Sequence, residues 1–128
     1  MAIRIVRLGS ARAPDEGTRI GTVRRPPRGV PKSQFGSGNW YDVWFPVLAP
    51  SVQTMKLGQA ATTVKDWADF IKAYKAEMSA PEAQHSLNLL AALSHTSPLS
   101  VGCYCEDESH CHRSVLRAWL QSRGADIK

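Results

Sequence analysis

The chain has 128 residues, of which 43% are hydrophobic and 21% charged, so it is long enough for one hydrophobic core and too short for two. The sequence contains no run of about 18 apolar residues, which excludes a transmembrane helix, and residues 1–8 lack the apolar stretch of a signal peptide. Three cysteines cannot all pair within one chain, so we expect a cytoplasmic protein with reduced thiols, and the net charge of +5 suggests an anionic partner.

The first half of the chain predicts strands and a long loop. Alternating apolar residues predict a strand over residues 3–8 and another over residues 18–25, which Pro26-Pro27 ends. Residues 26–39 are rich in proline and glycine and are expected to form a loop, and long loops in small domains are often functional. An aromatic and β-branched run predicts a third strand or extended segment over residues 40–48.

Two helices are predicted next. Residues 63–78 carry an apolar stripe with helical spacing, which consists of Val64, Trp67, Ile71, Tyr74 and Met78. Ser79 and Glu82 have the spacing of a capping box and predict a second helix to about residue 94.

The last part of the chain predicts a strand over residues 99–105 and a helix that Ser109 caps and that runs through Arg123. The order of elements predicts an α/β fold: a single small domain over residues 1–128, with a mixed, mostly parallel sheet of about four strands and three main helices. Ligands of such sheets bind beyond the carboxyl ends of the strands, close to helix N-termini.

The segment 103–113 lies at this position and is the densest in reactive side chains, and three interpretations compete for it. In the first, Cys111 is a nucleophile, because a cysteine in the first turn of a helix beside cations gains thiolate character. Cys111 and Arg117 also have the Cys-x5-Arg spacing of tyrosine phosphatases, but the residues between them look helical and lack glycine. A phosphatase loop is therefore not expected.

The second interpretation is a zinc domain. Its potential ligands are Cys103, Cys105, His110, Cys111 and His112. The Cys-x-Cys spacing is not that of a zinc knuckle and no second pair exists, so the sequence predicts no stoichiometric zinc and no other cofactor. Cys103 and Cys105 are expected to be buried strand residues.

The third interpretation is a polar ligand site. Glu106 at the strand end orients Arg113 or acts as a general base, and Arg113 offers a bidentate fork for phosphate or carboxylate. An internal ion pair between Glu106 and Arg113 is the structural alternative. The basic loop contributes Arg24 and Arg28 if it folds over the same strand ends.

Several of these segments together resemble a known family. The matching features are Arg24, Pro27-Arg28-Gly29-Val30, Ala49-Pro50-Ser51, the helical residues Phe70, Tyr74 and Glu77, Cys105-Glu106 and Cys111-His112-Arg113. On these residues the chain resembles the bacterial YeaO-like family, domain of unknown function 488, over nearly its whole length. The resemblance implies a fold and leaves the activity open.

The leading functional prediction is an anionic-ligand site, for a small phosphorylated ligand or a nucleic acid, with thiol or acid–base catalysis as the first hypothesis for a reaction. The candidate catalytic residues are Cys111, His112 and Glu106, and the candidate ligand-binding residues are Arg113, Arg24, Arg28 and Ser109. A non-enzymatic module that binds nucleic acid or protein through the basic N-terminal region is the alternative. Cations that converge on Cys111 would favour the enzyme, and a flat basic face would favour the module.

Overall fold

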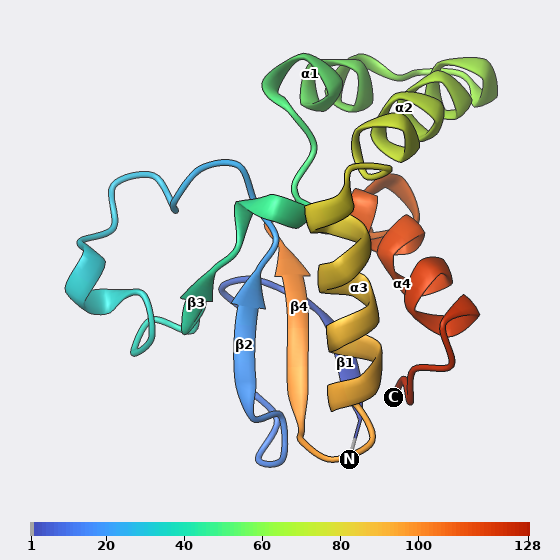
Figure 1. The fold of residues 1–128 in the computed structure, drawn as a ribbon. Coiled ribbons are helices and arrows are strands. Elements are labelled where there is room, and N and C mark those ends of the chain that lie inside the picture. Colours follow the sequence, from blue (N-terminus) through green and yellow to red (C-terminus); the bar gives the residue numbers. More distant parts are fainter. Residues whose placement is uncertain (1) are drawn as a thin grey trace.

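A parallel sheet forms the centre of the protein, whose computed structural model describes residues 2–128 (Figure 1). Its strands are β1 (Ile3–Arg7), β2 (Thr18–Gly21), β3 (Val43–Trp44) and β4 (Leu99–Cys103). They lie in the order β1-β4-β2-β3 and every pair of neighbours is parallel. Val101 of β4 is in register with Ile5 on one side and with Ile20 on the other, and all five residues of β4 are buried.

Helices surround this sheet on one side and at one end. They are α1 (Val52–Ala60), α2 (Val64–Glu77), α3 (Pro81–Leu93) and α4 (His112–Ser122). Figure 1 shows α3 and α4 alongside the sheet, whereas α1 and α2 lie beyond the end to which the arrows of β2 and β4 point. The predicted α/β class is thereby confirmed. Within residues 2–128, no helix combines the length and the apolar character needed to cross a bilayer.

The main hydrophobic core joins the sheet to α2, α3 and α4. Its buried residues include Ile3, Leu48, Phe70, Tyr74, Leu87, Leu99, Val101, Leu116 and Leu120. A smaller cluster gathers at the carboxyl ends of the strands and consists of Leu8, Val23, Tyr41, Cys103 and Cys111. Two of the three cysteines therefore pack at the sheet end where ligands of parallel sheets bind.

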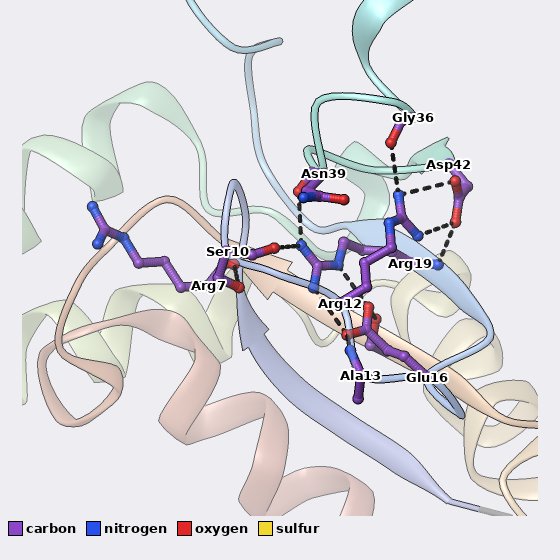
Figure 2. Close-up of polar contacts among 10 residues, drawn as sticks. Arg7, Ser10, Arg12, Ala13, Glu16, Arg19, Gly36, Asn39 and Asp42 are labelled. Carbon is purple, nitrogen blue, oxygen red and sulfur yellow. Dashed lines mark hydrogen bonds and ion pairs between the residues drawn. The ribbon is translucent and has the colours of Figure 1, made fainter.

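The opposite face of the sheet holds a buried ion pair between Arg19 and Glu16 (Figure 2). The Arg19 side chain is 0% exposed and donates to both carboxylate oxygens of Glu16, over 2.7 and 2.9 Å. Its third nitrogen donates to the carbonyl oxygens of Ser10 and Asn39, over 2.9 and 2.7 Å. Ser100 of β4 also donates to Glu16, over 2.9 Å. One guanidinium thus connects two loops to the sheet.

Several element boundaries differ from the prediction. Only Val43–Trp44 of the expected strand over residues 40–48 pairs with the sheet, because Tyr41 turns inward to pack on Gly21 and Pro46 begins a 3₁₀ turn. Helix α1 was not predicted; Ser51 caps it by accepting from the amide of Thr54.

The helical predictions need three further corrections. Val64 is 90% exposed and lies outside the apolar stripe assigned to it. Helix α3 begins without the predicted capping box, because the Ser79 hydroxyl donates to the carbonyl of Ala76. The last helix begins at His112 with Cys111 as its N-cap, and the segment before it forms a separate 3₁₀ turn over Glu108–His110.

Candidate functional site

A cavity of about 730 Å³ opens where the carboxyl end of β4 meets the start of α4. Its walls come from the loop after β1, the basic loop after β2, helices α1 and α2, and the segment between β4 and α4. The apolar and aromatic side chains in these walls include Leu8, Val23, Trp40, Met55, Trp67, Phe70 and Tyr104. The cavity has the size and the largely apolar lining of a small-molecule site.

Three free thiols line this cavity. The sulfur atoms of Cys103 and Cys105 lie 3.8 Å apart. The sulfur of Cys111 lies 3.7 Å from Nδ1 of His112. Cys103, Cys111 and His112 are buried, and Cys105 is the exposed member. The chain reaches this arrangement because β4 ends at Cys103 and α4 begins beside the same strand end.

The hydrogen bonds of His112 determine which ring nitrogen faces Cys111. Nε2 lies 2.7 Å from the carbonyl oxygen of Thr22. A carbonyl oxygen only accepts, so Nε2 carries the proton and the lone pair of the neutral ring is on Nδ1. Nδ1 is the nitrogen beside the Cys111 sulfur. The ring of Tyr74 packs edge-on against the imidazole, with 5.4 Å between the ring centres, and further fixes its orientation.

This environment changes the acidity of the thiols. The pKa of Cys111 is lowered, foremost by hydrogen bonds from the thiols of Cys103 and Cys105. Burial opposes this shift, and the adjacent His112 adds to it. Cys111 is also the N-cap of α4, where the helix dipole favours a negative charge. The pKa of Cys103 is raised, because hydrogen bonds to Cys105 and Cys111 and its burial hold its proton.

Arginines surround the mouth of the cavity, and they are Arg7, Arg24, Arg25 and Arg28. Arg24 is anchored, since it donates to the carbonyl oxygens of Ala49 and Pro50 over 2.9 and 3.2 Å. Arg7 extends away from the buried ion pair (Figure 2) and donates to the carbonyl of Tyr104 over 3.3 Å. Within residues 2–128, the guanidinium groups of Arg25 and Arg28 have no hydrogen-bond or ion-pair partner, and both are therefore available to a ligand.

The structure brings together four of the residues predicted for the site. Cys111, His112, Arg24 and Arg28 all line the cavity. Glu106, Ser109 and Arg113 are not among its lining residues.

Each of these three residues has other contacts. The Glu106 side chain is 84% exposed and lies 3.6 Å from Arg7 instead of pairing with Arg113. Ser109 donates its amide and hydroxyl to Asp107 within the 3₁₀ turn. Arg113 is 3% exposed and donates to the carbonyl of Cys105 over 2.6 Å, while its Nε has no partner.

The expectation that Cys111 and Arg117 do not form a phosphatase loop agrees with the structure. The intervening residues are helical, and Arg117 forms a two-pronged ion pair with Glu108, over 2.6 and 2.9 Å. This pair joins the first turns of α4 to the preceding 3₁₀ turn and thereby holds the loop that carries the cysteines.

Sequence reasoning missed the walls contributed by Met55, Trp67 and Phe70, because it predicted no element over residues 52–60 and placed Trp67 only in the apolar stripe of a helix. The Ser51 cap was the available signal for α1. The contact from Thr22 to His112 spans 90 residues and has no sequence signal.

Residues 3–124 match the family DUF488-N3a, described as the active DUF488-N3 subclade. The chain belongs to this family. The match covers nearly the whole DUF488 domain described above, from the first residue of β1 to the turn after α4, and it agrees with the resemblance seen in the sequence. Comparisons with curated proteins and with solved structures gave no significant match.

Proposed function

We propose that this DUF488 domain is a thiol-dependent enzyme for a small anionic substrate, with Cys111 as nucleophile and His112 as proton acceptor. The observation that carries the proposal is the lone pair of Nδ1, 3.7 Å from the Cys111 sulfur at the head of α4. A thiol beside a base whose other nitrogen is fixed by a third group is the arrangement that activates a nucleophile. Both side chains face the cavity.

The distribution of cations supports an anionic substrate. The seven arginines of residues 1–35 fall into two groups. Members of one group are paired with acids: Arg4 with Asp15, Arg12 with Asp42 and Arg19 with Glu16. The other group, Arg7, Arg24, Arg25 and Arg28, lines the cavity. Of these, Arg7 lies 3.6 Å from the exposed Glu106, and Arg24 donates to backbone carbonyls. Arginines that line the same cavity as Cys111 favour the enzyme over a flat basic face for nucleic acid or protein.

The lining of the cavity suggests a phosphorylated small molecule with an apolar or aromatic portion. The guanidinium groups of Arg25 and Arg28 suit phosphate or carboxylate oxygens. Trp40 and Trp67 offer flat apolar surfaces for the rest of the molecule. The description of the family as active is in keeping with an enzyme, and a cytoplasmic location would keep the thiols reduced.

The proposed reaction is a transfer through a covalent intermediate. His112 accepts the thiol proton, and the Cys111 sulfur forms a bond to an electrophilic atom of the substrate. The bond from that atom to the leaving group breaks, and the leaving group takes the proton from His112. Water then cleaves the bond to sulfur and regenerates the thiol.

The test compares two alkylating agents of similar size, neutral iodoacetamide and anionic iodoacetate, on protein freed of metal with a chelator. Mass spectrometry gives the labelling rate of each cysteine. We expect Cys111 to react fastest with both agents, and Arg28→Gln to slow iodoacetate several-fold while iodoacetamide labelling stays unchanged. Lys32→Gln, in the same basic loop and outside the cavity lining, is the matched control and should change neither rate.

Three results would count against the enzyme. Cys111 that stays unlabelled in the folded protein is not a nucleophile accessible from the cavity. Equal rates for all three cysteines would show that its environment does not activate it. If neither Arg28→Gln nor Arg25→Gln slows labelling by iodoacetate, the proposal of an anionic substrate is excluded.

A further inference from the structure

The thiol cluster carries a second inference, which does not depend on the proposed enzyme. We propose that Cys103, Cys105, Cys111 and His112 form a four-coordinate site for a thiophilic divalent metal ion, represented by zinc. Such a set of three thiolates and one imidazole is a common zinc coordination.

The donor atoms of this cluster converge. The sulfur atoms of Cys103 and Cys111 and a ring nitrogen of His112 all lie within 4.8 Å of one another. Cys105 adds a fourth donor, 3.8 Å from the Cys103 sulfur. Cys105 is not one of the three residues whose donor atoms lie within 4.8 Å of one another, so its side chain would have to move closer to complete the site. Three donor atoms therefore surround one position, and the Cys105 sulfur lies next to one of them.

Two distances between these donor atoms match the edges of a zinc tetrahedron. Zinc–sulfur bonds of about 2.3 Å give a sulfur–sulfur edge of about 3.8 Å in a regular tetrahedron, and zinc–nitrogen bonds of about 2.0–2.1 Å give a sulfur–nitrogen edge of about 3.5–3.6 Å. The structure has 3.8 Å between the sulfurs of Cys103 and Cys105 and 3.7 Å between Cys111 and Nδ1 of His112. Two edges therefore have the length that zinc requires.

The imidazole of His112 has the orientation expected of a metal ligand. A histidine that binds a metal usually donates its other N–H to a carbonyl or carboxylate, which fixes the ring. Nε2 of His112 donates to the Thr22 carbonyl over 2.7 Å, and the hydroxyl of Thr22 in turn donates to the carbonyl of Gly102 over 3.0 Å. Nδ1, the nitrogen that faces the sulfurs, is left available as the ligand.

Arg113 carries a buried positive charge next to the cysteine loop. Its side chain is 3% exposed, its Nε has no hydrogen-bond partner, and it donates to the Cys105 carbonyl. A buried cation without a nearby anion is costly. Three thiolates and a divalent ion carry a net charge of −1, which would balance Arg113. The role of this arginine is then to neutralise the site from behind the cysteine loop.

The spacing Cys-x-Cys-x5-Cys-His led to the expectation of no stoichiometric zinc. That expectation considered positions along the chain only, whereas parallel folding brings the end of β4 and the start of α4 to one point. The exposed Cys105 gives an ion access from solvent. A bound ion would hold the Cys111 thiolate, so zinc would block the proposed nucleophile.

The experiment titrates reduced, metal-free protein with zinc in competition with a chromophoric chelator, and with cobalt(II), whose charge-transfer absorption reports thiolate ligands. We expect one ion per chain and a thiolate-to-cobalt band. Cys105→Ser and His112→Asn should each weaken zinc binding at least tenfold. Circular dichroism establishes that the variants fold. His110→Asn, a histidine on the same loop that is not one of the four proposed ligands, is the matched control and should bind zinc as the wild type does.

Absence of zinc binding by the folded wild type would overturn the proposal, as would binding that Cys105→Ser and His112→Asn leave unchanged or that His110→Asn weakens equally. Protection of Cys111 from iodoacetamide by one equivalent of zinc would support it. The two proposals fail separately. Labelling of Cys111 without zinc binding refutes only the metal site, and zinc binding by a protein whose metal-free Cys111 is inert refutes only the enzyme.

Discussion

Replacing Glu16 by glutamine tests whether its buried ion pair with Arg19 stabilises the attachment of two loops to the sheet. Each carboxylate oxygen of Glu16 accepts two hydrogen bonds: one from Arg19 and Ser100, the other from Arg19 and the amide of Ala13. Whichever oxygen the amide group replaces, two donors lose their acceptor, and the charge of Arg19 remains buried without a counter-ion.

The expected loss follows from these contacts. A hydrogen bond to a charged group contributes about 1.5–3 kcal/mol and a neutral one about 0.5–1.5 kcal/mol, so the two lost bonds account for about 2–4.5 kcal/mol. Removal of one partner of a buried ion pair costs about 3–5 kcal/mol in other proteins. We therefore expect Glu16→Gln to lower the free energy of unfolding by about 3–4 kcal/mol.

Urea unfolding, followed by far-ultraviolet circular dichroism, measures this loss. With a slope of about 1.5 kcal/mol per molar urea, the midpoint should fall by about 2–3 M. Asp15→Asn is the matched control, because the neighbouring Asp15 is exposed and pairs with Arg4 and Lys128 at the surface. Exposed pairs contribute little, so its midpoint should barely move. Equal shifts for the two variants would refute the reasoning.

Two further predictions concern the same face of the sheet. Burial raises the pKa of Glu16, but hydrogen bonds from Arg19 and Ser100 outweigh it, and the pKa lies below the ordinary 4.5. A carboxylate with a lower pKa in the folded than in the unfolded chain stabilises above its unfolded pKa and loses that contribution as the pH falls through its folded pKa. Urea unfolding between pH 6 and 3 should therefore show stability falling below about pH 4.5, less steeply in Glu16→Gln; identical slopes would contradict this. Gly9 has φ +90°, and a Cβ there would lie 2.9 Å from the Trp40 ring, so Gly9→Ala should cost about 1–2 kcal/mol and change the near-ultraviolet circular dichroism. Gly29→Ala has similar backbone strain at φ +75° with nothing within 4 Å, and should leave that spectrum unchanged; a change in both or in neither would argue against the Trp40 contact.

The sequence predicted elements well where a periodic pattern and burial coincide. Apolar residues recur in β1 and alternate in β4, and α2 and α4 each bury one stripe, so both kinds of element follow from the pattern. Helix α1 was not predicted because Thr54 is its only buried residue. It is held in place by Glu77, whose carboxylate accepts hydrogen bonds from the amide of Ser51 and the hydroxyl of Thr54. Such a tertiary anchor leaves no periodic signal.

The sequence predicts where the candidate site lies in the fold, but not how its side chains are oriented. Its location at a strand end follows from parallel topology, and Cys111, His112, Arg24 and Arg28 line the cavity as residues of that region. The directions of side chains in segment 103–113 depend on where α4 begins, and its N-cap is Cys111, two residues later than the predicted cap Ser109. That offset points Arg113 to the interior, where the sequence predicted a ligand contact.

The place of β4 in the sheet affects how the chain reaches its fold during synthesis. β4 pairs with both β1 and β2, yet about 80 residues separate it from the end of β2. A ribosome that adds about 5–20 residues per second needs about 4–16 s to make that stretch. During this time β1 and β2 lack the strand that joins them, and their edges are open to other chains. Folding of the sheet, and with it formation of the cysteine cluster, must therefore wait until nearly the whole domain has been translated.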